Sequence, residues 1–194
     1  MNLLILGLIV FLGIHSARVF GEGPRQAVID RFGPMAWKGV YSVLSVVGFV
    51  LLIQGYAAAR LDPIVLWVPP VGMRHAASVL TLLAFILLAA AYVPGNPIKA
   101  RLRHPMTLAV KTWALAHLLS NGNGADVLLF GGFLVWAVLV FRAARARDRI
   151  HPPAPVAVRP MALLWCVVVG SVAWAAFAFW AHAALIGVRP FGGA

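Results

Sequence analysis

The chain has 194 residues, of which 62% are hydrophobic and only 11% charged, and its mean hydropathy is +0.93. These values exclude a disordered chain and an ordinary soluble domain, and they are typical of a protein that crosses a membrane several times. The formal net charge of +11 would suggest nucleic-acid binding in a soluble protein, but here the basic residues flank apolar stretches, as topology signals do. We therefore expect the lipid bilayer, and no nucleic acid, as the main partner.

A helix that crosses a bilayer needs about 20 mostly apolar residues. The chain supplies about six stretches of this kind, joined by connections too short to hold a soluble domain. We predict an all-α fold: a polytopic transmembrane helical bundle of about six spans, forming a single domain over residues 1–194. The predicted spans cover, in chain order, about 2–20, 35–59, 71–93, 106–120, 125–141 and 160–188.

The connections between these spans are marked by glycine, proline and charged residues. Residues 21–24 are expected to end the first span, and 25–34 to form a polar loop or a short surface helix. Loops are predicted at 62–70 and 94–97, and a stiff, solvated linker at 151–155.

The basic residues are divided unevenly between the two sides of the predicted bundle. Only Arg60, Arg74 and Arg189 lie on one side, and the other 13 of the 16 lysines and arginines lie on the opposite side. Because basic connections stay in the cytoplasm, this asymmetry predicts that both termini are on the non-cytoplasmic side.

The acidic residues leave little room for acid–base chemistry inside the bundle. All five are expected in loops or at span ends: Glu22, Asp30, Asp62, Asp126 and Asp148. The lack of a carboxylate pair within the spans disfavours hydrolysis, a carboxylate-bound dimetal site and transport coupled to an intramembrane acid. The sequence also has no phosphate-binding glycine loop, no nucleophile elbow and no paired-cysteine zinc motif.

Three histidines, His15, His75 and His117, are predicted inside three different spans. A buried neutral imidazole usually acts only as a hydrogen-bonding group, but imidazoles that face one another across a helical bundle are also the usual ligands of haem iron. Counted at 1.5 Å per residue, His15 and His75 match the depth of His117 about equally well, so depth does not choose its partner. His151 and His182 are expected to be a linker residue and an interfacial residue.

The short span 106–120 concentrates the candidate cofactor-binding features. Trp113 precedes His117 by four residues, so the two side chains share a helix face. Ala114 and Ala116 keep the helix slim, which permits the close approach of a partner helix or a flat macrocycle.

Three basic side chains could contact a cofactor carboxylate. Lys111 is expected to reach the cytoplasmic interface, and it could equally neutralise a propionate, as could Arg18. His104, next to a proline at the start of the same span, is either a helix-start residue without chemistry or a contact to a headgroup or cofactor carboxylate.

Four motifs carry a resemblance to a known family. They are Ile14-His15-Ser16, Trp37-Lys38-x-x-Tyr41-Ser42, Arg103-His104-Pro105 and Lys111-x-Trp113-Ala114-x-Ala116-His117-Leu118-x-x-Asn121-Gly122. With these motifs the chain resembles the NnrU family of bacterial integral membrane proteins, which is linked to denitrification and nitric oxide metabolism. The resemblance is strongest over 1–150, whereas the final span at 160–188 is generic. It implies a multi-pass protein of the bacterial inner (cytoplasmic) membrane.

A relative of this family, the zeta-carotene isomerase of plants and cyanobacteria, depends on haem b. Its Arg-His-Pro and Trp-x-x-Ala-His motifs have the same separation as those here, and its two haem-ligating histidines match His15 and His117. That relative has a cysteine, proposed as an alternative iron ligand, where this chain has Ala114. The resemblance therefore implies haem binding without implying the ligand switch of the isomerase.

We expect a haem b protein with His15 and His117 as axial ligands, His75 as the substitute, and redox or isomerase-like chemistry if it is an enzyme. A membrane redox partner or a reductase subunit would then be its protein partner. The alternative is a non-enzymatic accessory or assembly factor for nitrite or nitric oxide reduction. A membrane methyltransferase is a weaker alternative, because Arg-His-Pro also occurs there, but no glutamate follows Glu22.

Overall fold

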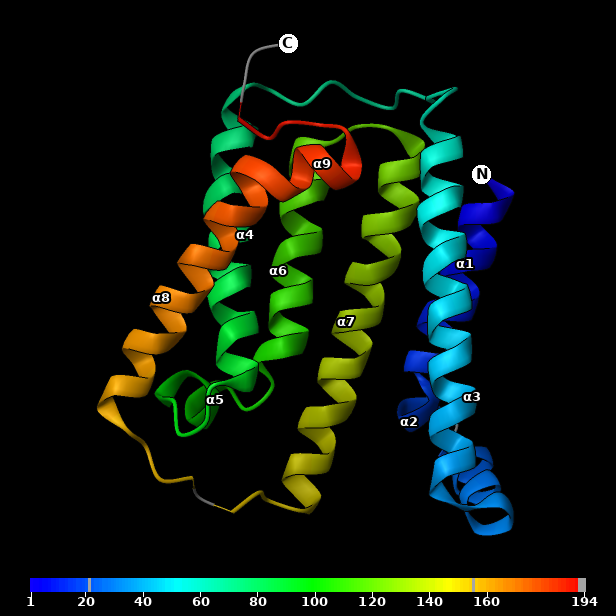
Figure 1. The fold of residues 1–194 in the computed structure, drawn as a ribbon, viewed down its shortest axis with the longest axis vertical. Coiled ribbons are helices and arrows are strands. Elements are labelled where there is room, and N and C mark those ends of the chain that lie inside the picture. Colours follow the sequence, from blue (N-terminus) through cyan, green and yellow to red (C-terminus); the bar gives the residue numbers. More distant parts are fainter. Residues whose placement is uncertain (21, 155, 192–194) are drawn as a thin grey trace. The chain divides into compact units, whose positions relative to one another are not determined.

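The computed structural model describes residues 1–20, 22–154 and 156–191. Its elements are α1 (Asn2–His15), α2 (Ala17–Phe20), α3 (Glu22–Ala59), α4 (Gly72–Tyr92), α5 (Pro97–Leu102), α6 (Pro105–Ser120), α7 (Gly124–Ile150), α8 (Pro160–Ala176), the π-helix η1 (Phe177–Ala181) and α9 (His182–Ile186) (Figure 1). Apart from one isolated bridge between Val65 and Asn123, these ranges contain no β-structure. Gly21, in the predicted turn at 21–24, and Pro155, in the predicted linker at 151–155, lie outside the described ranges.

Within the described ranges, four helices are long and apolar enough to cross a membrane: Glu22–Ala59, Gly72–Tyr92, Gly124–Ile150 and Pro160–Ile186. The protein is thus a helical membrane protein, as predicted. α1 is apolar but has only 14 residues, and α6 has 16. The count of six spans and the side of the termini stay predictions.

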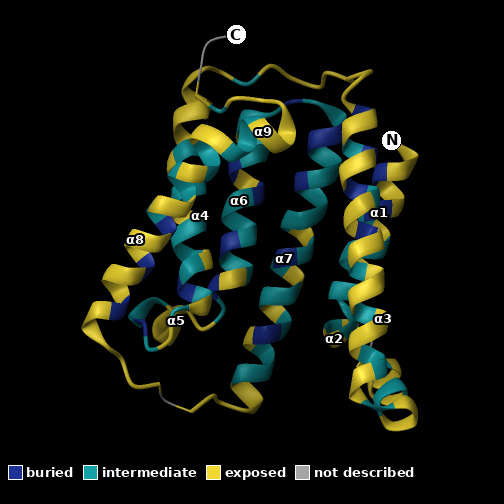
Figure 2. Ribbon diagram, viewed as in Figure 1, coloured by how far each residue is buried: buried dark blue, intermediate teal, exposed yellow. Residues whose placement is uncertain are grey.

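The helices form two compact units. The first comprises Met1–Val68 and Asn121–Ala143, and the second comprises Pro69–Ser120 and Ala144–Ala194. In Figure 2 exposed residues run along α3 of the first unit and α8 of the second. Many of these residues are large and apolar, such as Val43 and Ile53 on α3 and Leu164 and Val172 on α8. Such surfaces suit contact with lipid.

In the first unit, α1 and α3 pack backbone to backbone. A Cβ atom added to Gly7 would lie 2.6 Å from the backbone nitrogen of Leu52, and one added to Gly48 would lie 2.7 Å from that of Phe11. Small residues allow this approach, and van der Waals packing of this kind holds helices together where lipid removes the hydrophobic driving force. Leu4, which is completely buried, lies in the core beside this contact.

The first predicted span ends earlier than expected. α1 stops at His15 rather than at Phe20, and α2 forms a separate turn of helix. Ser16 interrupts the ladder: its Oγ donates to the carbonyl of Leu12 (2.6 Å), and its backbone N–H bonds the carbonyls of Gly13 and Ile14. Serine side chains compete with helical hydrogen bonds in this way.

A buried carboxylate joins α3 to α7 in the first unit. Asp126 lies at the start of α7, at a span end as predicted, and is only 2% exposed. Its Oδ1 accepts a hydrogen bond from the hydroxyl of Tyr56 (2.5 Å), and its Oδ2 accepts one from the backbone N–H of Asn123 (3.1 Å). A carboxylate in the first turn of a helix is also favoured by the helix dipole.

Tyr56→Phe is expected to destabilise the protein because it leaves Asp126 buried without its phenolic donor. Loss of a hydrogen bond to a charged group costs about 1.5–3 kcal/mol. Thermal unfolding in detergent, followed by tryptophan fluorescence, measures the shift. Tyr92→Phe removes the same hydroxyl from an exposed residue and should leave the midpoint unchanged; equal midpoints for the two variants would contradict the prediction.

In the second unit, α4 packs against α6 and α8. A Cβ atom on Gly170 of α8 would lie 2.6 Å from the Cα of Ile86, and the indole N–H of Trp174 donates to Thr81 Oγ1 (3.0 Å). The predicted turn after α4 is confirmed, but the short helix α5 that follows was not predicted. Buried Asn96 caps both helices: it donates to the carbonyl of Ala90 and accepts from the backbone N–H of Lys99.

Candidate functional site

His15 lies in the last turn of α1 among aromatic rings from three helices of the first unit. Its ring stacks on Phe11 of the same helix, with centroids 4.2 Å apart. The Tyr41 ring of α3 lies 5.2 Å away, and the Trp136 ring of α7 lies 6.4 Å away, edge-on. The half-buried imidazole is thus held on several sides.

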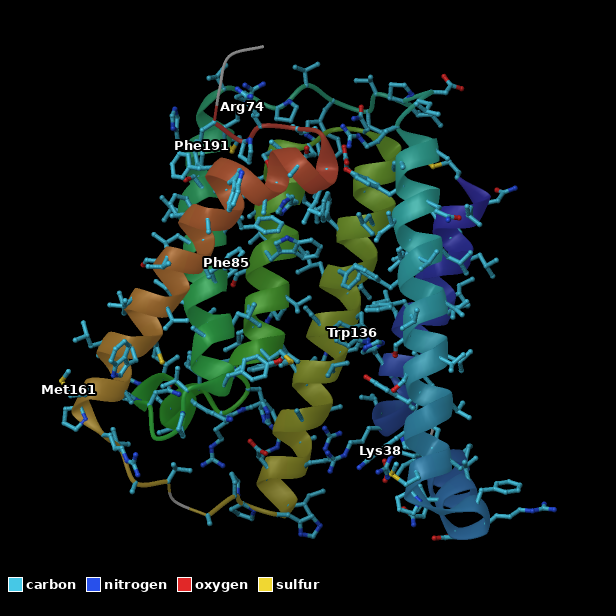
Figure 3. The ribbon with its side chains drawn as sticks, viewed as in Figure 1. Lys38, Arg74, Phe85, Trp136, Met161 and Phe191 are labelled. Atoms are coloured by element: carbon cyan, nitrogen blue, oxygen red, sulfur yellow. The ribbon has the colours of Figure 1, made fainter. Side chains whose placement is uncertain are left out.

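Sequence reasoning missed two members of this group, Phe11 and Trp136, the second of which is labelled in Figure 3. The indole N–H of Trp136 donates to Ser16 Oγ (3.1 Å), next to His15. A tryptophan within a span needs an acceptor for its N–H, and this requirement was the available signal. The signal names no partner, because Ser16 is 120 residues away in the sequence.

The hydrogen bond of His15 determines its tautomer. Nδ1 lies 2.7 Å from the backbone carbonyl oxygen of Phe11. Because a carbonyl oxygen only accepts, Nδ1 carries the hydrogen, and in the neutral ring Nε2 carries the lone pair. Histidines that bind metals commonly donate their other ring N–H to a backbone carbonyl in this manner.

His117 on α6, in the second unit, has the same arrangement. Its Nδ1 lies 2.9 Å from the carbonyl oxygen of Trp113, and the two rings are 5.1 Å apart. The prediction that Trp113 and His117 share a face is confirmed. Ala114 and Ala116 on the same helix are completely buried. Each predicted iron ligand therefore follows an aromatic residue by four positions and donates to its carbonyl.

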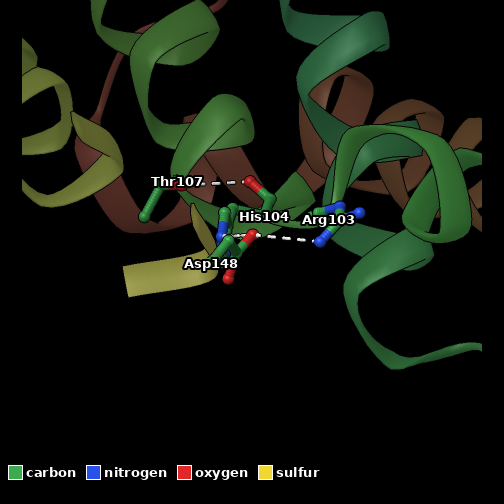
Figure 4. Close-up of polar contacts among 4 residues, drawn as sticks. All are labelled: Arg103, His104, Thr107 and Asp148. Atoms are coloured by element: carbon green, nitrogen blue, oxygen red, sulfur yellow. Dashed lines mark hydrogen bonds and ion pairs between the residues drawn. The ribbon is translucent and has the colours of Figure 1, made fainter. Parts of the chain in front are cut away.

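His104 belongs to a different cluster, at the start of α6 (Figure 4). Its Nε2 lies 2.9 Å from Asp148 Oδ2 on α7, and Arg103 Nη1 lies 3.9 Å from the same oxygen. Thr107 Oγ1 donates to the His104 carbonyl (3.0 Å). In this structure the contact of His104 with a carboxylate is therefore made with the protein itself.

Arg103 has a backbone φ of 65°, which is unusual for a residue with a side chain. Such a conformation costs of order 1–3 kcal/mol and persists only where its surroundings impose it. The N–H of Arg103 bonds the Lys99 carbonyl and the N–H of His104 bonds the Leu102 carbonyl, both at 2.8 Å. The turn between α5 and α6 is thus held by its backbone as well as by Asp148.

Asp148→Asn is expected to lower stability by about 1 kcal/mol, because the ion pairs are partly exposed and solvent screens them. The thermal unfolding midpoint in detergent measures the loss. Asp62→Asn makes the same chemical change at an exposed loop residue and serves as the matched control. A larger loss in the control than in Asp148→Asn would contradict the role of the cluster.

The other predicted site residues are more scattered. His75 lies in the first turn of α4 with its side chain exposed, and Arg18 is exposed on α2. Lys111 is half-buried on α6, two residues before Trp113. His182 Nδ1 bonds the carbonyl of Val188 (2.7 Å) near the end of the last span.

Taken one at a time, His15 and His117 each have the chemistry of an axial haem ligand. Over the described ranges, no group of three or more histidine, cysteine, aspartate or glutamate side chains could hold a metal ion. Haem iron takes its equatorial ligands from the porphyrin and needs only axial ligands from the protein, for which a neutral imidazole is typical. His15 and His117 both have the tautomer that ligation by Nε2 requires.

The comparisons with known proteins bear on the whole chain. It matches the NnrU family, described as NnrU protein, over residues 3–190. No curated protein and no solved structure matches it. Since the family match covers both compact units and nearly every residue, the chain belongs to the NnrU family.

Proposed function

We propose that this NnrU-family membrane protein binds haem b, with His15 and His117 as axial ligands. The observation that carries the proposal is the arrangement shared by the two histidines: each donates Nδ1–H to the carbonyl of the aromatic residue four positions earlier. This bond orients the ring and raises the basicity of Nε2 as a ligand. His75, which is exposed, is the substitute ligand.

The surrounding residues have roles that support such a site. Phe11, Tyr41 and Trp136 restrain the His15 ring, and Trp113 flanks His117. Aromatic side chains exclude water and lower the local dielectric, which tunes a redox centre. Lys111 and Arg18 are proposed to neutralise the propionates, whereas His104, whose Nε2 contacts Asp148, is proposed to hold the start of the helix that carries Lys111.

The proposed reaction class is redox chemistry or sensing in denitrification or nitric oxide metabolism. Bound haem would supply one-electron redox chemistry, and its potential would depend on axial ligands, hydrogen bonds and burial. Ala114 offers no thiolate, so a cysteine-based ligand switch is not part of the proposal. We also propose the bacterial cytoplasmic membrane as the location, on the basis of the NnrU family membership; the uneven distribution of basic residues predicts that both termini are on the non-cytoplasmic side.

The visible absorption spectrum of the detergent-solubilised protein, expressed with an adequate supply of haem, tests the proposal. We expect a Soret band that shifts on reduction, with the features of a six-coordinate low-spin haem. A featureless spectrum from folded protein would reject haem binding. If a nitrite or nitric oxide reductase subunit co-purifies with such colourless protein, the accessory-factor alternative is favoured.

A further inference from the structure

The N-terminal part of α3 cannot lie in the hydrocarbon together with the rest of that helix. A straight helix of 38 residues would be about 57 Å long, nearly twice the hydrocarbon thickness of about 30 Å. Gly33, with φ 82° and ψ 164°, breaks the helix just before Pro34. Residues 22–32 therefore form a separate helical segment at the start of α3, which we call the arm. In Figure 1 the arm lies at the lower end of α3.

The arm has a polar side that satisfies its own charges. Glu22, Gln26 and Asp30 are spaced four residues apart and are all exposed. Arg25 Nη1 bonds Glu22 Oε1 (2.9 Å), and Gln26 Nε2 donates to Asp30 Oδ1 (2.8 Å). Pairs at these spacings stabilise a helix whose polar side faces water.

The opposite side of the arm carries apolar residues. Val28 is half-buried, whereas Phe32, four residues later on the same side, is 63% exposed. Two further large apolar side chains flank the arm in the chain: Phe20 is 71% exposed and Met35 is 74% exposed. Large apolar side chains this exposed, within a helix that has a polar side and next to it in the chain, mark a surface that something apolar covers.

Basic side chains lie beside these aromatic rings. The guanidinium carbon of Arg31 is 5.2 Å from the centroid of the Phe32 ring, and that of Arg25 is 6.0 Å from the Trp37 ring. Lys38, which follows Trp37 in the chain and is labelled in Figure 3, is also exposed. Arginine and lysine next to aromatic rings are typical of the headgroup layer, where the charge meets phosphate and the ring meets the acyl boundary.

We propose that the arm lies along the membrane surface as an interfacial amphipathic helix, with the phospholipid headgroup layer as its partner. Phe32, Met35 and Phe20 insert at the acyl boundary, while Arg31 and Lys38 contact lipid phosphates. Gly33 supplies the turn between this surface helix and the membrane-spanning part of α3. The arm connects two apolar helices, so it emerges at one face of the membrane, which the basic residues predict to be the cytoplasmic face.

Site-directed spin labelling in nanodiscs of phosphatidylcholine and phosphatidylglycerol tests this assignment. Single cysteines replace Phe32, Met35, Gln26 and Asp30 in turn, in a Cys166→Ala background, since Cys166 is the chain's single cysteine. We expect the labels at 32 and 35 to lie about 5–10 Å below the phosphates and to be accessible to oxygen. The matched labels at 26 and 30, on the polar side of the same helix, should be accessible to a water-soluble nickel reagent.

Two outcomes would overturn the proposal. Equal exposure of all four labels to the nickel reagent would make the arm a solvated connection. Immobile labels at 32 and 35 that neither reagent reaches would show that protein, from a partner or a second copy, covers the apolar side. Because Phe32 and Met35 are exposed, their replacement should not prevent folding, and monodisperse gel filtration of each variant confirms this before labelling.

Discussion

His15→Ala and His117→Ala are each expected to abolish the Soret band of the purified protein. Each change removes a neutral imidazole whose Nδ1–H is already bonded to a backbone carbonyl and whose Nε2 carries the lone pair. Losing even a partner that only orients a ligand costs about 10- to 100-fold in metal affinity, so loss of a ligand should exceed this. Haem content, measured as the pyridine haemochromogen per mole of protein, gives the result.

His182→Ala is the matched control for this experiment. Its Nδ1 also bonds a backbone carbonyl, that of Val188, yet no ligand role is proposed for it. Haem content in this variant should equal that of the unchanged protein. A loss of haem in His75→Ala with retention in His15→Ala would move the ligand role to His75, and full occupancy in both His15→Ala and His117→Ala would remove the assignment.

Gly55→Leu is expected to prevent the packing of α1 on α3. A Cβ atom at Gly55 would overlap the backbone nitrogen of Leu4, and the next nearest atom is the Leu4 Cα at 2.6 Å. Backbone atoms cannot move aside as a flexible side chain can, so the two helices must separate. Overpacking typically costs about 1–3 kcal/mol, occasionally more, and here it also opens the core around Leu4 and Leu52. The thermal unfolding midpoint should fall strongly, or the protein should fail to accumulate.

Gly39→Leu provides the control within the same helix. A Cβ atom at Gly39 would have no neighbour within 4 Å, and the position is exposed. Leucine also has a higher helix propensity than glycine, by somewhat less than 1 kcal/mol, so the midpoint should stay the same or rise slightly. Comparable losses in the two variants would show that glycine acts through the helix backbone and not through the contact with α1.

Residue spacing along the chain predicts part of the candidate site and part of the fold. The shared face of Trp113 and His117 follows from helical spacing, and the structure confirms it. The surface helix was one of two structures expected for 25–34, and the arm is helical up to Phe32. Both features depend on interactions between residues that lie within two helical turns of each other in the chain.

Other features could not be derived from local patterns. Asp126 lies at a span end, as predicted, but nothing near it in the sequence reveals its burial or its bond with the hydroxyl of Tyr56, 70 residues away. The pairing of His104 with Asp148 joins residues 44 positions apart. The early end of α1 depends on Ser16, whose hydroxyl both donates to Leu12 and accepts from Trp136.

The order of residues is enough to predict that the protein is built from apolar helices, where most of these helices begin and end, and which histidines lie within them. Burial of apolar runs and the conformational limits of glycine and proline are local properties, and the order of residues reveals them. The folded structure is needed to see which backbones touch at Gly7, Gly48 and Gly55, and which partners bond Asp126, Asp148 and Trp136. A buried polar group or a close helix contact requires a complementary group in space, and many distant positions in a chain could supply that group.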